Sequence, residues 1–215
     1  MTNKQIDRAV VIKKRKKRKA AKKAQKAREW KKFFQSSQKE LKKLKEAINS
    51  NKTLFCIDTE DFEHNKELLE IGISIYKDNE IKTYHFIVAE NYDLRNEKYV
   101  PDHKEDFDFG DSFVFAVEDI EREIKKLYSK DCFLVGHSVH NDMDFLKKIK
   151  SHHFAGTFDT QILQKHINQT REDISLSNLC NSFNIETKHL HNAGNDAHYT
   201  LMCLLEMANL EILKK

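Results

Sequence analysis

The chain has 215 residues, of which 39% are hydrophobic and 10% aromatic, enough for one medium-sized domain with an appendage. Residues 1–50 carry 19 Lys and Arg against 4 Asp and Glu, a net charge of +15, whereas the remaining residues carry 19 against 30, a net charge of −11. A basic segment joined to an acidic body favours nucleic acid as the partner, because cations hold a polyanion and clustered carboxylates can bind metal ions.

Two classes of protein are excluded by composition. No run approaches the ~20 apolar residues of a membrane span, and residues 1–50 lack the apolar segment of a secretory signal. The four cysteines are too far apart for a CxxC zinc site and do not suggest a disulfide framework, so we expect reduced thiols in the core. We therefore expect a soluble intracellular protein, cytoplasmic or, in a eukaryote, nuclear.

Residues 1–50 are predicted to form a basic N-terminal arm that includes an amphipathic helix. Seven consecutive cations repel one another, which favours local disorder until a polyanion binds. These seven are also predicted to contact substrate phosphates without reading sequence: Lys13, Lys14, Arg15, Lys16, Lys17, Arg18 and Lys19. In a eukaryote the same run would serve as a nuclear localisation signal, which ranks above a mitochondrial presequence because the run is dominated by Lys.

The second half of the arm has apolar residues at helical spacing. Trp30, Phe34, Leu41, Leu44 and Ile48 fall near one face of a helix. Packing of this face against the protein's own domain is favoured over docking to a separate partner.

Residues 51–215 are predicted to form an α/β domain with a mixed five-stranded sheet flanked by helices. Short β-rich runs predict the strands, at 53–57, 69–76, 81–88, 132–135 and 154–158. Helical spacing predicts helices at 114–128, 141–149, 160–167, 176–183 and 196–213. A long polar loop is predicted at residues 91–111.

Acidic residues occur at three places where this fold could bring them together. Asp58 and Glu60 are two apart at the end of the first strand, so they share a face, and a cation such as Mg²⁺ or Mn²⁺ would offset their repulsion. Asp142 opens a helix after the Gly136 turn, where it can face the strand ends. Asp144 is rotated by roughly 200° from Asp142 and is expected to face solvent.

The third place is the segment His191-Asn-Ala-Gly-Asn-Asp196. Gly194 would permit a tight turn that brings His191 and Asp196 over one centre. A histidine can take a proton from water near neutral pH, which carboxylates bound to metal cannot do. We therefore predict that the acids hold metal and that the imidazole activates the nucleophile.

At these residues the sequence resembles the DEDDh exonucleases, the DnaQ-like or RNase T-like branch of the RNase H fold, over about residues 53–213. Asp58 and Glu60 match the first motif, Asp142 the second, and His191 with Asp196 the third, so all five catalytic positions are filled. The resemblance implies an RNase H-like sheet and 3′–5′ exonuclease activity. It also implies Mg²⁺ or Mn²⁺ as cofactor, with two ions per site.

The resemblance extends to two subgroups. Residues 135–142 and 158–161 look most like eukaryotic RNA exonucleases of the Rex type, whereas residues 99–101, 109–112 and 191–197 are more similar to a Gfd-type subgroup of fungi. After the first motif the sequence has Asp61-Phe-Glu63 where many members have Thr-Gly-Leu, so Phe62 is a candidate for stacking on a base and equally for the core. Contacts with substrate are predicted for Thr59, Phe62, His137 and Asn141.

Two functions follow from these patterns. The first is two-metal hydrolysis of single-stranded nucleic acid, RNA more than DNA, with one ion held by Asp58, Asp142 and Asp196 and the second by Asp58 and Glu60. His191 is the general base. The alternative is an RNA-binding or ribosome-binding adaptor that uses the exonuclease fold as a scaffold and docks through the basic arm.

Overall fold

The computed structural model describes residues 3–140, 145 and 153–210. The chain divides into two compact units, Met1–Lys39 and Glu40–Lys215. None of the helices in the described ranges combines the length and the hydropathy that crossing a membrane requires.

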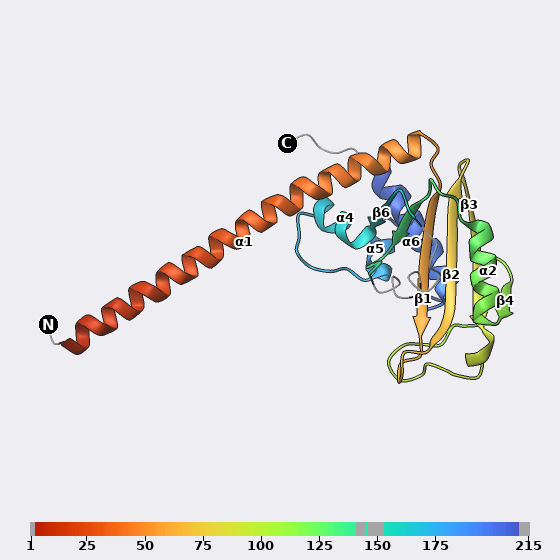
Figure 1. Cartoon of the computed structure of the whole chain (residues 1–215), viewed down its shortest axis with the longest axis horizontal. Helices are drawn as coiled ribbons and strands as arrows, with labels where there is room; N and C mark the ends of the chain where they lie inside the picture. The colour runs from red at the N-terminus through yellow and green to blue at the C-terminus, as the bar shows by residue number, and fades with distance from the viewer. Residues whose placement is uncertain (1–2, 141–144, 146–152, 211–215) are drawn as a thin grey trace. The chain divides into compact units, whose positions relative to one another are not determined.

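Helix α1 runs without a break from Asn3 to Asn49 and is drawn in red to orange in Figure 1. The expected disorder of Lys13–Lys19 is therefore wrong: these residues are helical, and all seven side chains are exposed. The physical reason is that Ala, Lys and Gln have high helix propensity, while water between the exposed cations weakens their repulsion. The helical character of the arm is confirmed.

The aromatic residues of α1 pack on each other within the first unit. The ring centroids of Trp30 and Phe33 lie 5.1 Å apart, and those of Trp30 and Phe34 lie 4.6 Å apart. This cluster follows from the i, i+3 and i+4 spacing of the three residues on one helical face.

In the second unit, the last turns of α1 enter the core. Leu41, Leu44 and Ala47 are buried, and Ile48 packs beside them. The prediction that this part of the amphipathic face packs on the protein's own domain is confirmed.

The second unit is built on a mixed sheet with helices on both faces, so the predicted α/β class is confirmed (Figure 1). Its strand order is β4-β3-β2-β1-β5-β6. The three long strands β1, β2 and β3 pair antiparallel, and β4, β5 and β6 each pair parallel with a neighbour. Their bounds are β1 Leu54–Asp61, β2 Leu68–Lys77, β3 Glu80–Val88, β4 Ser112–Phe115, β5 Phe133–Gly136 and β6 Gly156–Asp159.

The sheet has six strands and not the predicted five, because β4 occupies residues that were expected to begin a helix. Helix α2 begins only at Val117 and ends at Leu127. Phe113, Val114 and Phe115 have high β propensity, and they pair in parallel with Phe86, Ile87 and Val88 of β3. Helical spacing alone could not show that a neighbouring strand was available.

The remaining helices lie close to their predicted places. They are α4 Thr160–Ile167, α5 Leu176–Ser182 and α6 Ala193–Asn209. The short helix η1 Ala89–Asn91, which follows β3, was not predicted. The helix predicted at 141–149 lies outside the described residues except for Phe145, which is buried.

Alternation along β1 separates two hydrophobic cores. Leu54 and Cys56 face a core that includes α6 and the end of α1, whereas Phe55 and Ile57 face a core that includes α2. All four cysteines are buried thiols outside any disulfide, as predicted: Cys56, Cys132, Cys180 and Cys203.

Candidate active site

The first two predicted acids lie within β1, because this strand continues to Asp61 and does not end at Ile57. Asp58 pairs with Gly72 of β2, and Glu60 pairs with Glu70. Residues two apart share a face of the strand, so both acids point to the same side as Cys56. This is the face that α6 covers.

Gly72 allows α6 to begin directly above these acids. A Cβ atom on Gly72 would lie 1.8 Å from the carbonyl oxygen of Ala193, the first residue of α6. Side chains of directly opposed residues point to the same side of a sheet, so Asp58 points towards the start of α6. The absence of a side chain at Gly72 thus allows the third motif to pack close to the first.

The turn before α6 is made by His191, and this corrects the prediction for Gly194. His191 has a φ of +71°, in the left-handed region that histidine adopts more readily than most residues. Gly194 lies inside α6, where a Cβ atom would come within 2.7 Å of the Phe107 ring and 2.8 Å of the Cβ atom of His85. Its lack of a side chain is needed for space and not for the turn.

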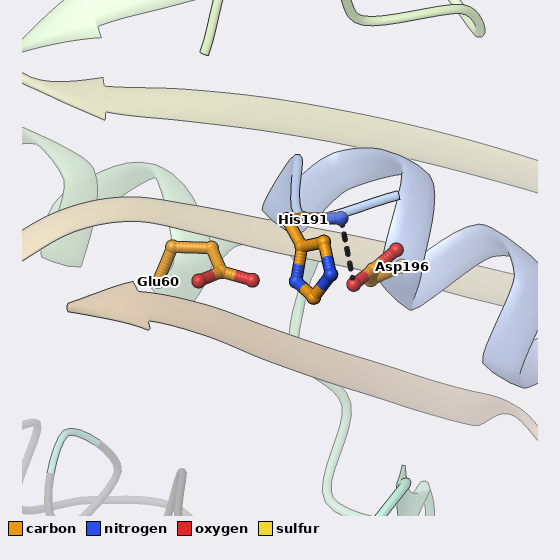
Figure 2. A group of neighbouring side chains, drawn as sticks. All are labelled: Glu60, His191 and Asp196. Carbon is orange, nitrogen blue, oxygen red and sulfur yellow. Dashed lines mark hydrogen bonds between the residues drawn. The ribbon is translucent and has the colours of Figure 1, made fainter. Parts of the chain in front are cut away.

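Glu60, His191 and Asp196 converge on one point (Figure 2). One potential ligand atom from each of the three lies within 4.8 Å of the others. The backbone N–H of His191 donates to Oδ2 of Asp196 at 3.2 Å, which fixes the loop to the helix. Asn192 caps α6 by accepting from the N–H of Asn195 at 3.1 Å.

The donor set fits a divalent cation. Oδ1 of Asp196 is buried and has no hydrogen-bond partner among the residues described. A buried carboxylate oxygen without a partner is costly, and a bound cation would remove this cost. Carboxylate oxygens and an imidazole nitrogen are ligands suited to Mn²⁺, and the carboxylates also to Mg²⁺.

Burial shifts the pKa values of Asp196, in the first turn of α6, and of His191, just before this helix. Desolvation raises the pKa of Asp196 to about 7, and the charge of Glu70 adds to the rise against the hydrogen bond from His191. His191 is exposed, and partial desolvation of its ring, with the nearby imidazole of His103, lowers its pKa. A cation would favour the ionised form of Asp196.

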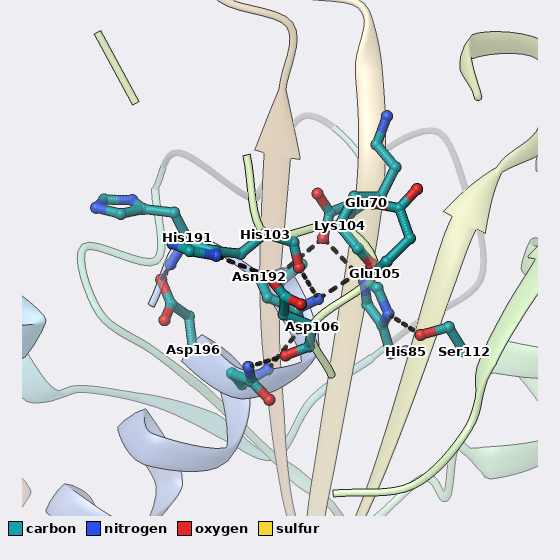
Figure 3. Close-up of polar contacts among 12 residues, drawn as sticks. Glu70, His85, His103, Lys104, Glu105, Asp106, Ser112, His191, Asn192 and Asp196 are labelled. Atoms are coloured by element: carbon teal, nitrogen blue, oxygen red, sulfur yellow. Dashed lines mark hydrogen bonds and ion pairs between the residues drawn. The ribbon is translucent and has the colours of Figure 1, made fainter. Parts of the chain in front are cut away.

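A polar network that sequence reasoning did not predict supports the start of α6 (Figure 3). Oε2 of the buried Glu70 accepts from the N–H of Ala193 at 3.2 Å and contacts Nε2 of His85 at 2.8 Å. Nδ1 of His85 in turn contacts the hydroxyl of Ser112 at 2.8 Å. The available signal was a glutamate within the apolar run of β2, since a buried acid needs partners.

The polar loop predicted at residues 91–111 also forms hydrogen bonds with the third motif. Asn192 donates to the carbonyl of His103 at 2.9 Å, and Asn195 donates to the carbonyl of Asp106 at 2.9 Å. Oδ1 of Asn195 accepts from the N–H of Asp108, also at 2.9 Å. Both asparagines are fully buried, so these contacts are sheltered from water.

The second motif is described only up to His140, and Asn141 and Asp142 lie outside the described residues, as does Asp144. Both ring nitrogens of His137 have partners at 2.8 Å, the hydroxyl of Thr160 and the carbonyl of Ile174. This geometry favours a structural role for His137 over the predicted contact with substrate.

Two other predicted substrate contacts differ in their placement. Thr59 alternates with Asp58 and Glu60 and pairs with Ile71, so its side chain points to the opposite face of the sheet. Phe62 is partly exposed, lies in neither hydrophobic core, and stacks edge-on with His64 at 5.0 Å between ring centroids. The exposed interpretation of Phe62 is therefore favoured over the core interpretation.

A mixed α/β sheet of this order, with carboxylates on its central strand and a His-Asp pair above them, defines an RNase H-like nuclease fold. Residues 53–207 match the DEDDh family model described as "DNA polymerase III subunit epsilon-like, C-terminal domain". The chain belongs to the DEDDh exonuclease family.

Two fungal relatives and one solved structure are similar to the chain. An uncharacterised nucleolar protein of Schizosaccharomyces pombe is 32% identical over 173 residues, which cover 75% of this chain and 71% of that protein. "Good for full DBP5 activity protein 2" of Saccharomyces cerevisiae is 29% identical over 206 residues, which cover 74% of this chain and 36% of that protein. Product-bound exonuclease I has a TM-score of 0.48 and 12% identity, over 74% of this chain and 45% of that chain. The chain spans less than half the length of the Saccharomyces relatives that it matches.

Proposed function

We propose that the chain is a metal-dependent 3′–5′ exonuclease that hydrolyses single-stranded nucleic acid, RNA in preference to DNA. The observation that carries this proposal is the convergence of Glu60, His191 and Asp196, with an unpartnered buried oxygen on Asp196. Membership of the DEDDh family supports the class of reaction. The preference for RNA rests on the resemblance of residues 135–142 and 158–161 to RNA exonucleases.

Four acids are proposed to hold two Mg²⁺ or Mn²⁺ ions. Glu60 and Asp196 belong to the observed cluster, and Asp58 points to the same side from β1. Asp142, outside the described residues, completes the proposed set. When bound, the ions neutralise the charge of the phosphodiester and of the leaving oxygen.

His191 is proposed to act as the general base. Its ring is exposed, so water can reach it, and its lowered pKa keeps the imidazole neutral at physiological pH. A neutral ring nitrogen can take a proton from the attacking water, and general base catalysis of this kind typically contributes 10²–10⁴-fold to a rate. The hydrogen bond from its backbone N–H to Asp196 fixes the position of His191 relative to this carboxylate.

Helix α1 is proposed to add affinity without taking part in the chemistry. Lys13–Lys19 are all exposed, so they can contact phosphates of any sequence. The same observation favours the second candidate function, an RNA-binding or ribosome-binding adaptor. In that case the arm would bind RNA while the acids of the second unit would turn over no substrate.

One experiment tests the proposal and separates the two candidates. Matched 5′-labelled RNA and DNA, single-stranded and duplex, are incubated with the protein in Mg²⁺, in Mn²⁺ or in EDTA. We expect products shortened stepwise from the 3′ end, RNA cut faster than DNA, and no products in EDTA or with Asp58→Ala. Binding without cleavage in either metal would favour the adaptor, and cleavage by Asp58→Ala would contradict the proposed acids.

A further inference from the structure

The loop of residues 92–106 is tied to the chain just after the first motif. Asn96 is buried: its Oδ1 accepts from the N–H of Glu63 at 2.9 Å, and its Nδ2 donates to the carbonyl of Asp61 at 3.0 Å. The carboxylate of Glu63 accepts the N–H of Lys98 at 3.2 Å and of Tyr99 at 2.9 Å. Only 6% of the Glu63 side chain is exposed, so this clamp is well packed.

The same loop is tied to the third motif from its other end. Asn192 donates to the carbonyls of His103 and Lys104. Lys104 is fully buried, and its Nζ donates to the carbonyls of Tyr92 at 3.2 Å and Leu94 at 2.6 Å. The loop thus connects the strand that carries Glu60 with the segment that carries His191 and Asp196.

Tyr99 stands out from this fixed loop. It is 72% exposed, the highest value among the large hydrophobic residues that the structure describes. Nζ of Lys98 lies 4.7 Å from the centre of its ring. A backbone held by Glu63 and a side chain left in water are what a stacking platform needs, because little order is lost when a flat ligand binds.

The position of Tyr99 relative to the acids is limited by the chain. Glu60 and Glu63 are three residues apart, so their Cα atoms are separated by at most about 10 Å. The N–H of Tyr99 is bonded to the Glu63 carboxylate, so the backbone of Tyr99 lies beside the segment that directly follows the first motif. Phe62 lies nearby but is less exposed and already packs on His64.

We propose that Tyr99, with Lys98 beside it, forms a base-stacking subsite for a nucleotide on the 5′ side of the scissile phosphate of a single-stranded substrate. This proposal rests on the proposed exonuclease function. The aromatic face accepts any base, and the ammonium of Lys98 attracts the adjoining phosphate. Duplex ends fit poorly, because a paired base is already stacked on its neighbours.

The test uses the full-length protein and single-stranded RNA that carries one abasic site at successive positions from the 3′ end. Tyr99→Ala is compared with wild type, with Tyr99→Trp, and with Tyr92→Ala as a matched control on the same loop. Tyr92 is 38% exposed and lies beside Arg95, whose guanidinium is 5.6 Å from the ring. KM and kcat are measured in Mg²⁺, and Kd is measured in EDTA by fluorescence anisotropy.

We expect Tyr99→Ala to raise KM and Kd about tenfold, a value within the range for one base on one aromatic ring, with little change in kcat. Tyr99→Trp and Tyr92→Ala should behave like wild type. An abasic site at the stacked position should raise KM and Kd of the wild type to the values of Tyr99→Ala, so that the two proteins no longer differ. A tyrosine with a merely structural role would not produce this result.

Unchanged KM and Kd in Tyr99→Ala would overturn the subsite and would favour Tyr99 as an anchor for a protein partner. The same loss on intact and abasic RNA would overturn it as well. If wild type cleaves nothing but its Kd still depends on Tyr99 and on the base, the exonuclease proposal fails and the subsite stands.

Discussion

The arm and the second unit carry opposite charge, and they arrange it in opposite ways. The cations of Lys13–Lys19 are all exposed along one helix, whereas Glu60, His191 and Asp196 come from separate segments to within 4.8 Å. Binding through exposed cations tolerates small displacements, since each contact with a phosphate is loose and similar. Chemistry at a converged cluster does not, because a misplacement of about 1 Å can cost 10²-fold in rate.

The largest effect is expected from His191→Asn in the cluster. Asparagine tolerates the left-handed backbone of His191 but provides no base, so kcat should fall by about 10²–10⁴-fold. Affinity for Mn²⁺, measured by calorimetry, should change much less because the acids remain. His189→Asn, which changes a histidine paired with Asp108, is the matched control. Loss of Mn²⁺ binding equal to the loss of rate would make His191 a ligand and not a base.

The wild-type pH profile sharpens this assignment. Because the base works in its neutral form and the pKa of His191 is lowered from 6.5, kcat should hold down to below this value and then fall on acidification. A profile still rising above pH 7 would point to another group.

Gly72→Ala tests how strongly the rate depends on the position of the cluster. The new methyl group would meet the carbonyl of Ala193, so the start of α6 must move and kcat should fall about 10–100-fold. Gly156→Ala is the control, because its nearest neighbour is the flexible end of Lys43. Thermal unfolding measured in parallel shows whether Gly72→Ala remains folded. Similar rates for both variants would contradict the close approach.

Asp196→Asn should raise stability while it removes metal binding. The pKa of Asp196 is about 7 in the folded state against about 3.8 unfolded, so stability in EDTA declines as pH rises from about 4 to 7. Above pH 7 the neutral amide should therefore gain up to about 4 kcal/mol over wild type, and near pH 4 almost nothing. Urea unfolding at pH 4 and pH 8 measures this difference. Equal gains at both pH values would exclude ionisation as the cause.

The smallest effect is expected from the arm. Replacement of Lys13–Lys19 by glutamine keeps the helix, since glutamine is a good helix former, but removes seven positive charges. RNA affinity should become less dependent on salt, by up to about 5 in the slope of log K against log salt. Hydrolysis of a dinucleotide should be unchanged. A changed rate on this short substrate would mean that the arm takes part in catalysis, and its role would then no longer differ from that of the cluster.

The sequence predicted those parts of the fold that depend on local pattern. The short β-rich runs predicted β1, β2 and β3, with bounds that differ from those of the structure by at most four residues at either end. It failed at β4, where pairing with β3 overrides helical spacing, and at Lys13–Lys19, where helix propensity exceeds repulsion.

The site shows the same limit. Glu60, His191 and Asp196 were predicted from their motifs, but their support was not, since it depends on residues distant in sequence. Glu70 and Asn192 act through contacts with residues 123 and 89 positions away. Gly194 was assigned to a turn because local sequence cannot show the ring of Phe107 that fills the space beside it.

The sheet narrows at both margins. Its three long strands β1, β2 and β3 have 8, 10 and 9 residues, whereas β5 and the outermost strands β4 and β6 have only 4 each. A short outer strand offers few backbone groups on which a foreign strand could grow. Because β1, β2 and β3 each have a neighbouring strand on both sides, their backbone groups are shielded from cross-molecular pairing. We therefore expect little amyloid-like assembly, even though Phe113 and Val114 are exposed at one margin.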